Sequence, residues 1–156
     1  MTKEIDIDRI DRKILRQLAQ DGRIAWSELA DLVGLSLTPT LRRVRRLEEA
    51  GYIQGYVAKL DEARLAGRMS VLVAVTLTSQ SEETLARFEE AIVAAPEVMS
   101  CFLMTGDADY SLRVVVPDLE TYHQFLTRTL TRIPGVAHIK SGFALRTVLN
   151  RASALV

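Results

Sequence analysis

Four arginines lie within five consecutive positions of the chain, and side chains with hydroxyl groups precede them. A guanidinium forms paired hydrogen bonds with a phosphate or with guanine, and the amides and hydroxyls at a helix N-terminus also bind phosphates. These residue types at this spacing predict a DNA-binding surface on one helix. The predicted surface consists of Ser36, Thr38, Pro39, Thr40, Arg42, Arg43, Arg45 and Arg46.

An ordinary solvated helix face would also account for these arginines. No acidic residue occurs between Gly34 and Leu47, and the helix expected just before this one ends in a tight turn. A short helix, a turn and a second helix with a basic face form the helix-turn-helix arrangement. The neighbouring sequence therefore favours DNA binding.

A second polar group, TGDADY (Thr105–Tyr110), lies between two apolar runs. The residues alone favour a hairpin turn, since Gly allows positive φ and Asp bonds to nearby backbone. A ligand site stays open as the alternative, because a carboxylate there could receive an ammonium group and the turn amides a carboxylate.

Residues suited to catalysis or metal binding are few. His123 and His138 are the only histidines, and we expect surface or structural roles for both. Cys101 is the only cysteine, which excludes an internal disulfide and a cysteine-based zinc cluster. It lies in the apolar run Val98–Met104, so we expect a buried, inert thiol. We expect no metal and no cofactor.

Three helices are expected to position the arginines. Apolar residues recur at helical spacing from Ile7 to Leu18, which predicts a first helix from near Asp8 to Asp21. Its charged side, with Asp8 and Asp11 among basic residues, looks merely solvated. The second helix is expected at 26–33. The third begins at Ser36 as N-cap and stops at Gly51, and Pro39 is tolerated in its first turn. Its predicted buried stripe is Leu37, Leu41, Val44 and Leu47.

The rest of the chain changes character after Gly51. Residues 52–60 are rich in β-forming types and follow the third helix as a wing would, and no packing pattern follows until Met69. From there the pattern is β-α-β-β-α-β, the ferredoxin-like order. The predicted fold is α+β, an N-terminal winged helix-turn-helix domain followed by a ferredoxin-like βαββαβ domain. The expected parts are a DNA-binding domain at 1–51, a wing, hinge and linker at 52–68, and a second domain at 69–156.

The first strand of the second domain, at 70–78, is apolar on both of its faces. Two helices can cover only one face of a four-stranded sheet, so the other face favours sheet-to-sheet dimerisation. A symmetric homodimer would place two DNA-binding domains on a pseudo-palindromic site in double-stranded DNA.

The formal net charge is zero, and residues 1–51 carry ten Lys and Arg against nine Asp and Glu. The basic surface is therefore local, and a dimer or larger assembly would have to multiply a modest affinity. No apolar run approaches the length of a membrane span, and the charged N-terminus is unlike a signal peptide. We expect a cytoplasmic protein without a membrane partner.

The sequence resembles the Lrp/AsnC family of bacterial and archaeal transcriptional regulators, over nearly the whole chain and in the same order. The matching motifs are IDRIDRKILRQLAQDGRI (7–24), GLSLTPTLRRVRRLEEAGYIQGYVAKLD (34–61), TGDADY (105–110) and IPGV (133–136). Leu37 and Thr40 depart from the residues common at those points, which puts the target sequence in doubt and leaves DNA binding unaffected.

The resemblance implies a winged helix-turn-helix followed by a RAM (ACT-like) domain, with the segment after the recognition helix serving as a hinge strand that pairs with a partner subunit. It implies dimers that often assemble into octamers, and an amino-acid effector bound where dimers meet. The residues implied in effector binding are Thr105, Gly106, Asp107, Asp109, Tyr110, Ser141 and Phe143.

Three functions are consistent with parts of this sequence. The leading hypothesis is a DNA-binding transcriptional regulator of amino-acid metabolism or transport, modulated by an amino-acid-like effector. The second is an architectural DNA-binding protein without an effector, which shares every feature of the DNA-binding domain. The third is an enzyme subunit similar to the sirohaem decarboxylases, and the arginine helix argues against it.

Overall fold

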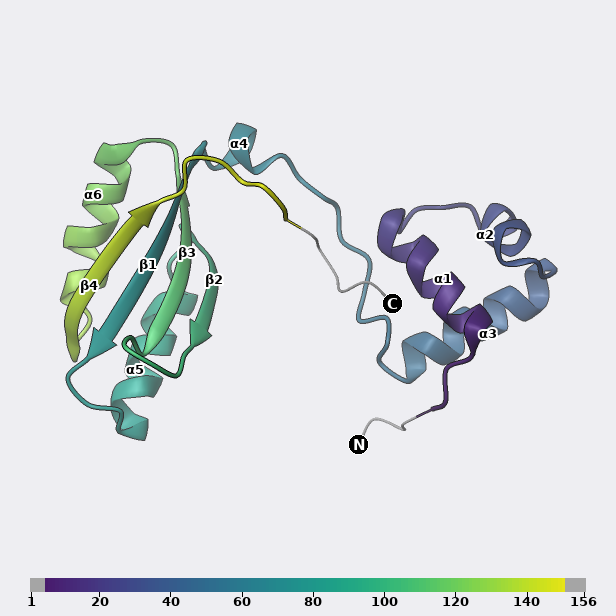
Figure 1. The fold of residues 1–156 in the computed structure, drawn as a ribbon, viewed down its shortest axis with the longest axis horizontal. Helices are drawn as coiled ribbons and strands as arrows, with labels where there is room; N and C mark the ends of the chain where they lie inside the picture. The colour runs from purple at the N-terminus through teal and green to yellow at the C-terminus, as the bar shows by residue number, and fades with distance from the viewer. Residues whose placement is uncertain (1–4, 151–156) are drawn as a thin grey trace. The chain divides into compact units, whose positions relative to one another are not determined.

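The computed structural model describes residues 5–150, which form two compact units. The first unit reaches to Lys59 and the second is Leu60–Val148. The first unit holds three helices, labelled in Figure 1. The assignment of 52–68 to a hinge stays a prediction. The three helices are α1 (Arg9–Gln20), α2 (Trp26–Val33) and α3 (Leu37–Glu49).

Caps explain where these helices begin and end. Asp8 is the N-cap of α1, and Asp8 and Asp11 form a capping box in which each carboxylate accepts the other's backbone N–H. Gly34 and Gly51 have φ values of 77° and 78° and close α2 and α3, as left-handed glycines commonly do. Ser36 is the N-cap of α3, as predicted, although its hydroxyl makes no capping hydrogen bond.

The core of the first unit lies between the three helices, but α3 is rotated from the predicted orientation. Val44 and Leu47 are buried as expected, whereas Leu37 is 46% exposed and Thr40 is fully buried. The predicted apolar stripe was therefore partly wrong, because α3 presents Thr40 to the core. The buried apolar residues that pack together in this core are Ile14, Leu15, Leu18, Leu29, Val33, Val44 and Leu47.

Residues 54–60 form no strand in the single chain. A strand needs a neighbour for its backbone hydrogen bonds, and the described residues provide none. Tyr56 instead donates its hydroxyl proton to Glu48 of α3 across 2.9 Å. A one-turn helix, α4 (Glu62–Leu65), then follows inside the segment predicted as linker.

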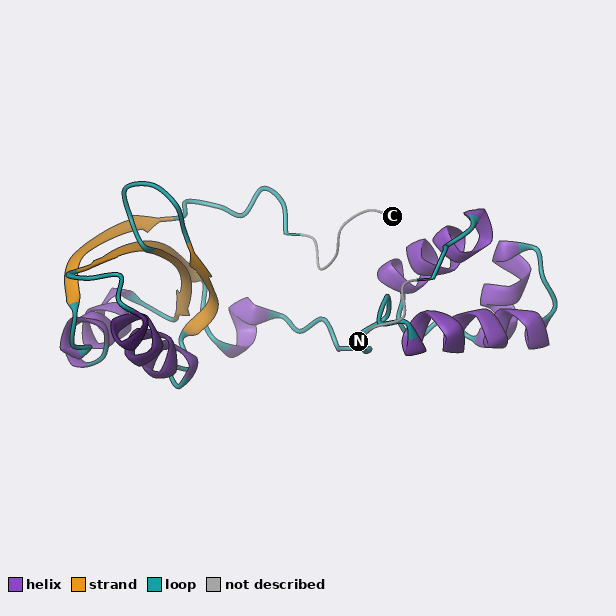
Figure 2. Cartoon of the chain, turned by 90° about the horizontal axis from the view of Figure 1, so that it is seen from below, coloured by secondary structure: helices purple, strands orange, loops and turns teal. Residues whose placement is uncertain are grey.

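The second unit has the predicted βαββαβ order, so the α+β fold with a ferredoxin-like second domain is confirmed. Its antiparallel sheet has the strand order β2-β3-β1-β4, and Figure 2 shows both long helices on one face of it. The elements are β1 (Met69–Leu77), α5 (Glu82–Val93), β2 (Val98–Leu103), β3 (Tyr110–Val116), α6 (Leu119–Arg128), the 3-10 turn η1 (Leu130–Arg132) and β4 (Val136–Phe143).

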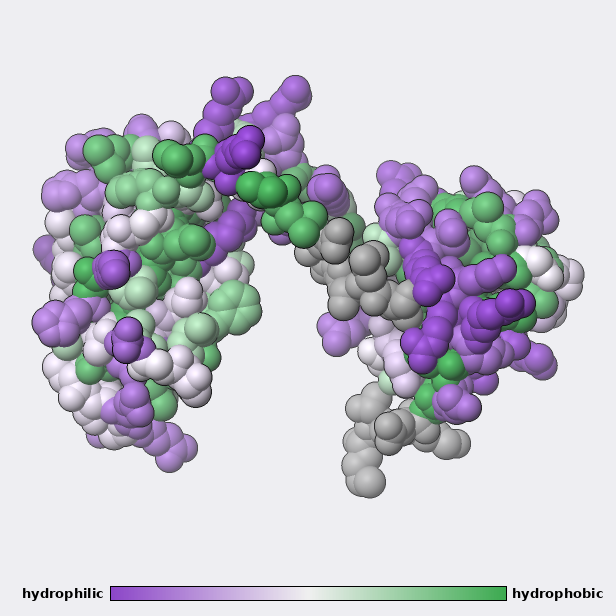
Figure 3. Space-filling view, in the orientation of Figure 1, coloured by the Kyte–Doolittle hydropathy of each residue, from purple (hydrophilic) through white to green (hydrophobic). Residues whose placement is uncertain are grey.

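The two faces of the sheet differ in burial. Val71, Val73 and Val75 of β1 are fully buried under the helices. Leu72, between them, is on the uncovered face and is 54% exposed, and Phe102 of β2 is 60% exposed. In the view of Figure 3, apolar side chains alternate with polar ones on this unit.

Cys101 is exposed, so the expectation of a buried thiol was wrong. Strand β2 is at the edge of the sheet, where it has one neighbouring strand, and most of its residues are exposed. Partial desolvation nevertheless raises the pKa of the thiol, with a smaller contribution from the charge of Glu89, which disfavours the reactive thiolate.

Candidate nucleic-acid interface and effector site

The predicted DNA-binding residues lie at the start and along one side of α3. Ser36 and Thr38 are exposed at its N-terminus, and Pro39 is half-buried. Arg42 and Arg45 are exposed and form no ion pair with any described residue. Backbone N–H groups of the first helical turn and these two guanidinium groups together suit the binding of phosphate oxygens.

Thr40 is not available on this surface. Its side chain is fully buried, and its hydroxyl donates to the Ser36 carbonyl oxygen across 2.9 Å. The helix turns this residue toward the core, so Thr40 stabilises the start of α3 and has no free hydroxyl for a phosphate. The sequence pattern could not show this, because threonine is common on both buried and exposed helix faces.

Arg43 and Arg46 face α1 and pair with its acidic residues. The Arg43 guanidinium lies 2.8 Å from a carboxylate oxygen of Asp8 and 2.8 Å from one of Asp11. Arg46 pairs with the other oxygen of Asp11. Asp11 is fully buried, so its charge is balanced by these two cations. The expectation that this side of α1 is merely solvated was therefore wrong for Asp11.

This pairing shifts two pKa values. Hydrogen bonds to Asp11 and Asp8 raise the pKa of Arg43. The pKa of Asp8 falls from 3.8 to about 2, mainly because its carboxylate accepts the backbone N–H of Asp11 and also bonds to Arg43. Both groups therefore stay charged across the physiological range.

The loop Thr105–Tyr110 divides into an exposed tip and a buried base. Thr105, Gly106 and Asp107 are exposed. Asp109 is 6% exposed, and its carboxylate accepts the Leu77 backbone N–H across 2.7 Å and the Gln80 side-chain amide across 2.5 Å. These bonds fix the loop to the end of β1, which is a structural role.

Tyr110 is also buried, at 1% exposed. Its ring contacts Phe88 of α5 with 4.4 Å between centroids, and its hydroxyl donates to Glu89 across 2.7 Å. Burial and the neighbouring carboxylate raise the pKa of Tyr110. In the single chain, Asp109 and Tyr110 offer little surface to a ligand.

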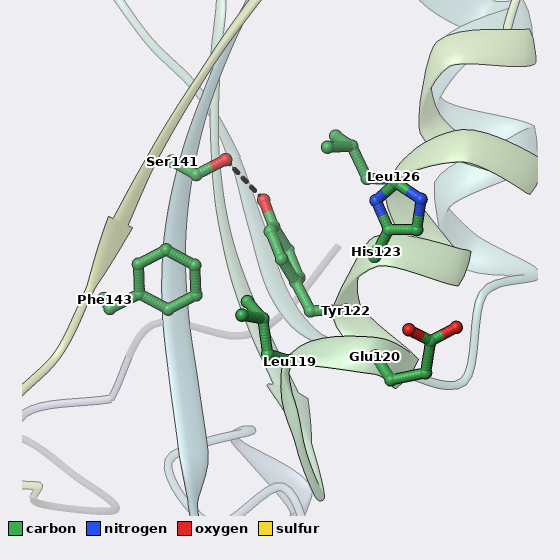
Figure 4. A pocket seen from close by; sticks show the side chains of 7 residues that line it. All are labelled: Leu119, Glu120, Tyr122, His123, Leu126, Ser141 and Phe143. Carbon is green, nitrogen blue, oxygen red and sulfur yellow. Dashed lines mark hydrogen bonds between the residues drawn. The ribbon is translucent and has the colours of Figure 1, made fainter.

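Ser141 and Phe143 lie elsewhere, in an open pocket of about 510 Å³ between α6 and β4. Figure 4 shows Tyr122 extending from α6 to Ser141, with 2.5 Å between the two hydroxyl oxygens. Phe143 packs edge-on against the Tyr122 ring at a centroid distance of 5.5 Å. The pocket is lined by Leu119, Glu120, Tyr122, His123, Leu126, Ser141 and Phe143.

No residue of the loop at 105–110 lines this pocket. The register explains the separation, since Ser141 pairs with Val73 near the middle of β1, whereas Tyr110 pairs with Val75 on its other side. The predicted effector residues thus fall into two groups. Tyr122 and Leu126 of α6 also line this pocket, and no local sequence pattern connects them with β4.

Within residues 5–150, the two histidines lie on different elements and form no metal site. His123 is at the pocket and His138 is exposed on β4, and no cluster of His, Cys, Asp or Glu there could hold a metal ion. None of the described helices has both the length and the apolar character that crossing a membrane requires.

Comparison with known families divides the chain as the structure does. Residues 7–54 match the family described as winged helix-turn-helix DNA-binding, and residues 70–154 match the Lrp/AsnC ligand binding domain. The sequence is 68% identical over 148 residues to the Bkd operon transcriptional regulator of Pseudomonas aeruginosa, covering 95% of this chain and 97% of that protein. It is 47% identical over 131 residues to the leucine-responsive regulatory protein of Escherichia coli K12, covering 84% and 80%.

Solved structures agree over nearly the full length. A transcriptional regulator from Neisseria meningitidis, solved as a complex with L-Met, superposes with a TM-score of 0.91 at 32% identity, and 96% of each chain is covered. An AsnC family regulator from Agrobacterium tumefaciens gives a TM-score of 0.90 at 40% identity, with 95% and 96% covered.

Proposed function

Since this chain belongs to the Lrp/AsnC family of DNA-binding transcriptional regulators, we propose that it controls genes of amino-acid metabolism or transport in response to an amino-acid-like effector. Its relatives are named as regulatory proteins, and this chain is likewise a regulator and not an enzyme. The decarboxylase hypothesis is therefore excluded.

The DNA half of the proposal relies on α3. We assign to base edges and phosphates its exposed N-terminal hydroxyls, Ser36 and Thr38, and the guanidinium groups of Arg42 and Arg45, which form no ion pair within residues 5–150. Pro39 lies among them. One α3 offers few cations. The operator-binding form is therefore proposed to be a homodimer on a pseudo-palindromic site.

The effector half relies chiefly on the pocket between α6 and β4. Its apolar lining suits an aliphatic or aromatic side chain, and Glu120 provides a carboxylate for an ammonium group. Two relatives support an amino-acid effector: one was solved with L-Met, and another is named for leucine. The exposed loop tip at Thr105, Gly106 and Asp107 is the second candidate contact, and subunit assembly would have to bring it to the ligand.

A thermal-shift screen of the full chain against the common amino acids tests the effector. A ligand at a hundred times its dissociation constant adds about 2.7 kcal/mol of stability, which is readily measured. We expect one amino acid or a small related group to raise the unfolding midpoint. No response at millimolar concentrations would favour an architectural protein without an effector.

Two variants locate the site once a ligand is found. Phe143→Ala removes the ring at the pocket, and Asp107→Ala removes an exposed carboxylate at the loop tip. We expect Phe143→Ala to abolish the shift and Asp107→Ala to retain it in full. The reverse result would place the effector at the loop. Asp109 is unsuitable for this test, because its loss would destabilise β1 and the loop directly.

A further inference from the structure

The four arginines of α3 form two pairs in different surroundings. Arg42 and Arg45 are exposed and form no ion pair among residues 5–150, whereas Arg43 and Arg46 are both bonded to Asp11. Residues three apart are neighbours on a helix surface, so each pair forms its own small patch. Thr38, four residues before Arg42, extends the exposed patch toward the helix N-terminus.

Asp11 is held on three sides. One carboxylate oxygen accepts from Arg43 across 2.8 Å, and the other accepts from Arg46 and from the Asp8 backbone N–H across 3.1 Å. The side chain is fully buried, and the side chains of Arg43 and Arg46, which neutralise it, are 25% and 44% exposed. Moving either arginine to a phosphate would leave a buried carboxylate with part of its charge unbalanced, which is unfavourable.

We propose that Asp11 is the positioning residue of the DNA-binding helix, holding Arg43 and Arg46 against α1 so that, of the four arginines, only Arg42 and Arg45 contact the DNA backbone. This inference rests on the proposed DNA-binding surface. Two of its arginines bind DNA phosphates, and the other two pair with Asp11. Asp8 assists, because its carboxylate bonds to Arg43 as well as to the start of α1.

Two double variants with the same change of charge test the division. Arg42→Gln with Arg45→Gln removes the exposed pair, and Arg43→Gln with Arg46→Gln removes the pair bonded to Asp11. Each is measured in the full chain for binding to a mixed-sequence DNA duplex at several salt concentrations, because phosphate contacts are independent of sequence. Unfolding is followed by the fluorescence of Trp26, the only tryptophan, which lies in α2 and so reports on the first unit.

The two variants are expected to have opposite effects on the salt slope and on the unfolding midpoint. Loss of Arg42 and Arg45 should leave the Trp26 unfolding midpoint unchanged and reduce the slope of log affinity against log salt by about 0.9 for each lost phosphate contact. Loss of Arg43 and Arg46 should lower the midpoint by several degrees and leave the salt slope unchanged at temperatures where the unit is folded. A reduced slope in this second variant would overturn the division, whatever its midpoint.

The role of Asp11 itself is tested by Asp11→Asn. Without the charge, Arg43 and Arg46 are free to neutralise phosphates, so the salt slope should become steeper by up to about 2 per DNA-binding unit while the midpoint falls. A merely structural residue would lower the midpoint and leave the slope as it was, and that result would refute the positioning role.

A third comparison covers the case in which a double variant does not fold. Arg46→Gln alone, matched to Arg42→Gln, removes the more exposed of the two paired arginines. The slope should fall by about 0.9 for Arg42→Gln and not for Arg46→Gln. Failure of the wild-type protein to bind any duplex would instead count against the proposed DNA-binding surface, so the two proposals fail separately.

Discussion

At the scale of single residues, the side chains that matter most are polar groups that the fold has removed from solvent. Asp11, Thr40 and Asp109 are buried, and each has its hydrogen bonds satisfied within its own unit. A buried polar group without partners is costly, so these residues fix the geometry around them. Asp11 and Thr40 lie beside the surface we assign to DNA, and Asp109 lies at the base of the loop whose tip is the second candidate effector contact.

The lowered pKa of Asp8 predicts how acid affects the first unit. A carboxyl whose pKa is about 2 when folded and 3.8 when unfolded contributes stability that is complete above about pH 4 and is lost as the pH falls toward 2. Asp8→Asn keeps an oxygen at the N-cap but removes the charge. We expect the variant to lose this part of the acid dependence, measured as the urea midpoint of Trp26 fluorescence at successive pH values.

Asp31→Asn is the matched control for this experiment, because Asp31 is an exposed acid of α2 with no ion pair among the described residues. It should follow the wild-type acid profile. An Asp8→Asn profile that also matches the wild type would show that the capping carboxylate does not contribute as its pKa implies.

At the scale of elements, close packing between turns constrains the second unit. Gly67 follows α4 with a φ of 116°, and a Cβ placed there would lie 2.3–2.4 Å from backbone atoms of Val116 and Pro117. Gly106, in the loop after β2, has a similar φ of 122° but open space around it. A side chain at Gly106 would meet backbone strain alone, whereas a side chain at Gly67 would also clash with neighbouring backbone.

Replacement of each glycine by alanine should have unequal costs. Gly106→Ala meets only the unfavourable backbone conformation, which costs on the order of 1 kcal/mol. Gly67→Ala adds a clash with backbone that cannot move aside, for a total loss of roughly 3 kcal/mol. Urea denaturation followed by far-ultraviolet circular dichroism measures both. Equal losses would show that the start of β1 can shift away from Pro117.

At the scale of the whole molecule, the uncovered face of the sheet is the feature that predicts assembly. Leu72 lies in the central strand β1 and is 54% exposed on that face. Beside it, Arg113 of β3 forms an ion pair with Glu62 of α4. A partly apolar sheet face of this kind is the surface on which we propose that two chains meet.

If two chains meet on this face as proposed, Leu72→Lys should convert that dimer to a monomer, as measured by sedimentation velocity. Affinity for DNA should fall by roughly a hundredfold or more, because two DNA-binding units no longer bind together. Val93→Lys makes the same change at an 86% exposed position of α5, away from the sheet face, and should change neither property. Unaltered sedimentation of the Leu72 variant would place the dimer contact elsewhere.

The sequence by itself determined the three helices of the first unit and the βαββαβ order of the second. Helical spacing, Asp8 as a cap and Gly51 as a stop are local signals, readable within a few neighbouring residues. The same signals indicated α3 as the DNA-binding helix and TGDADY as a turn between two strands. The family resemblance was also visible in the sequence, because its motifs are contiguous.

Only the tertiary structure decided which polar residues are free to bind. Arg43 and Asp11 are 32 positions apart, and Tyr122 and Ser141 are 19 apart, so no local pattern indicates that they meet. Helix periodicity gives the direction of a side chain relative to its own helix, but the packing of α3 against α1 sets which direction is buried. Contacts between segments distant in the sequence therefore distinguish the arginines that pair with Asp11 from those that form no ion pair in the described part of the chain.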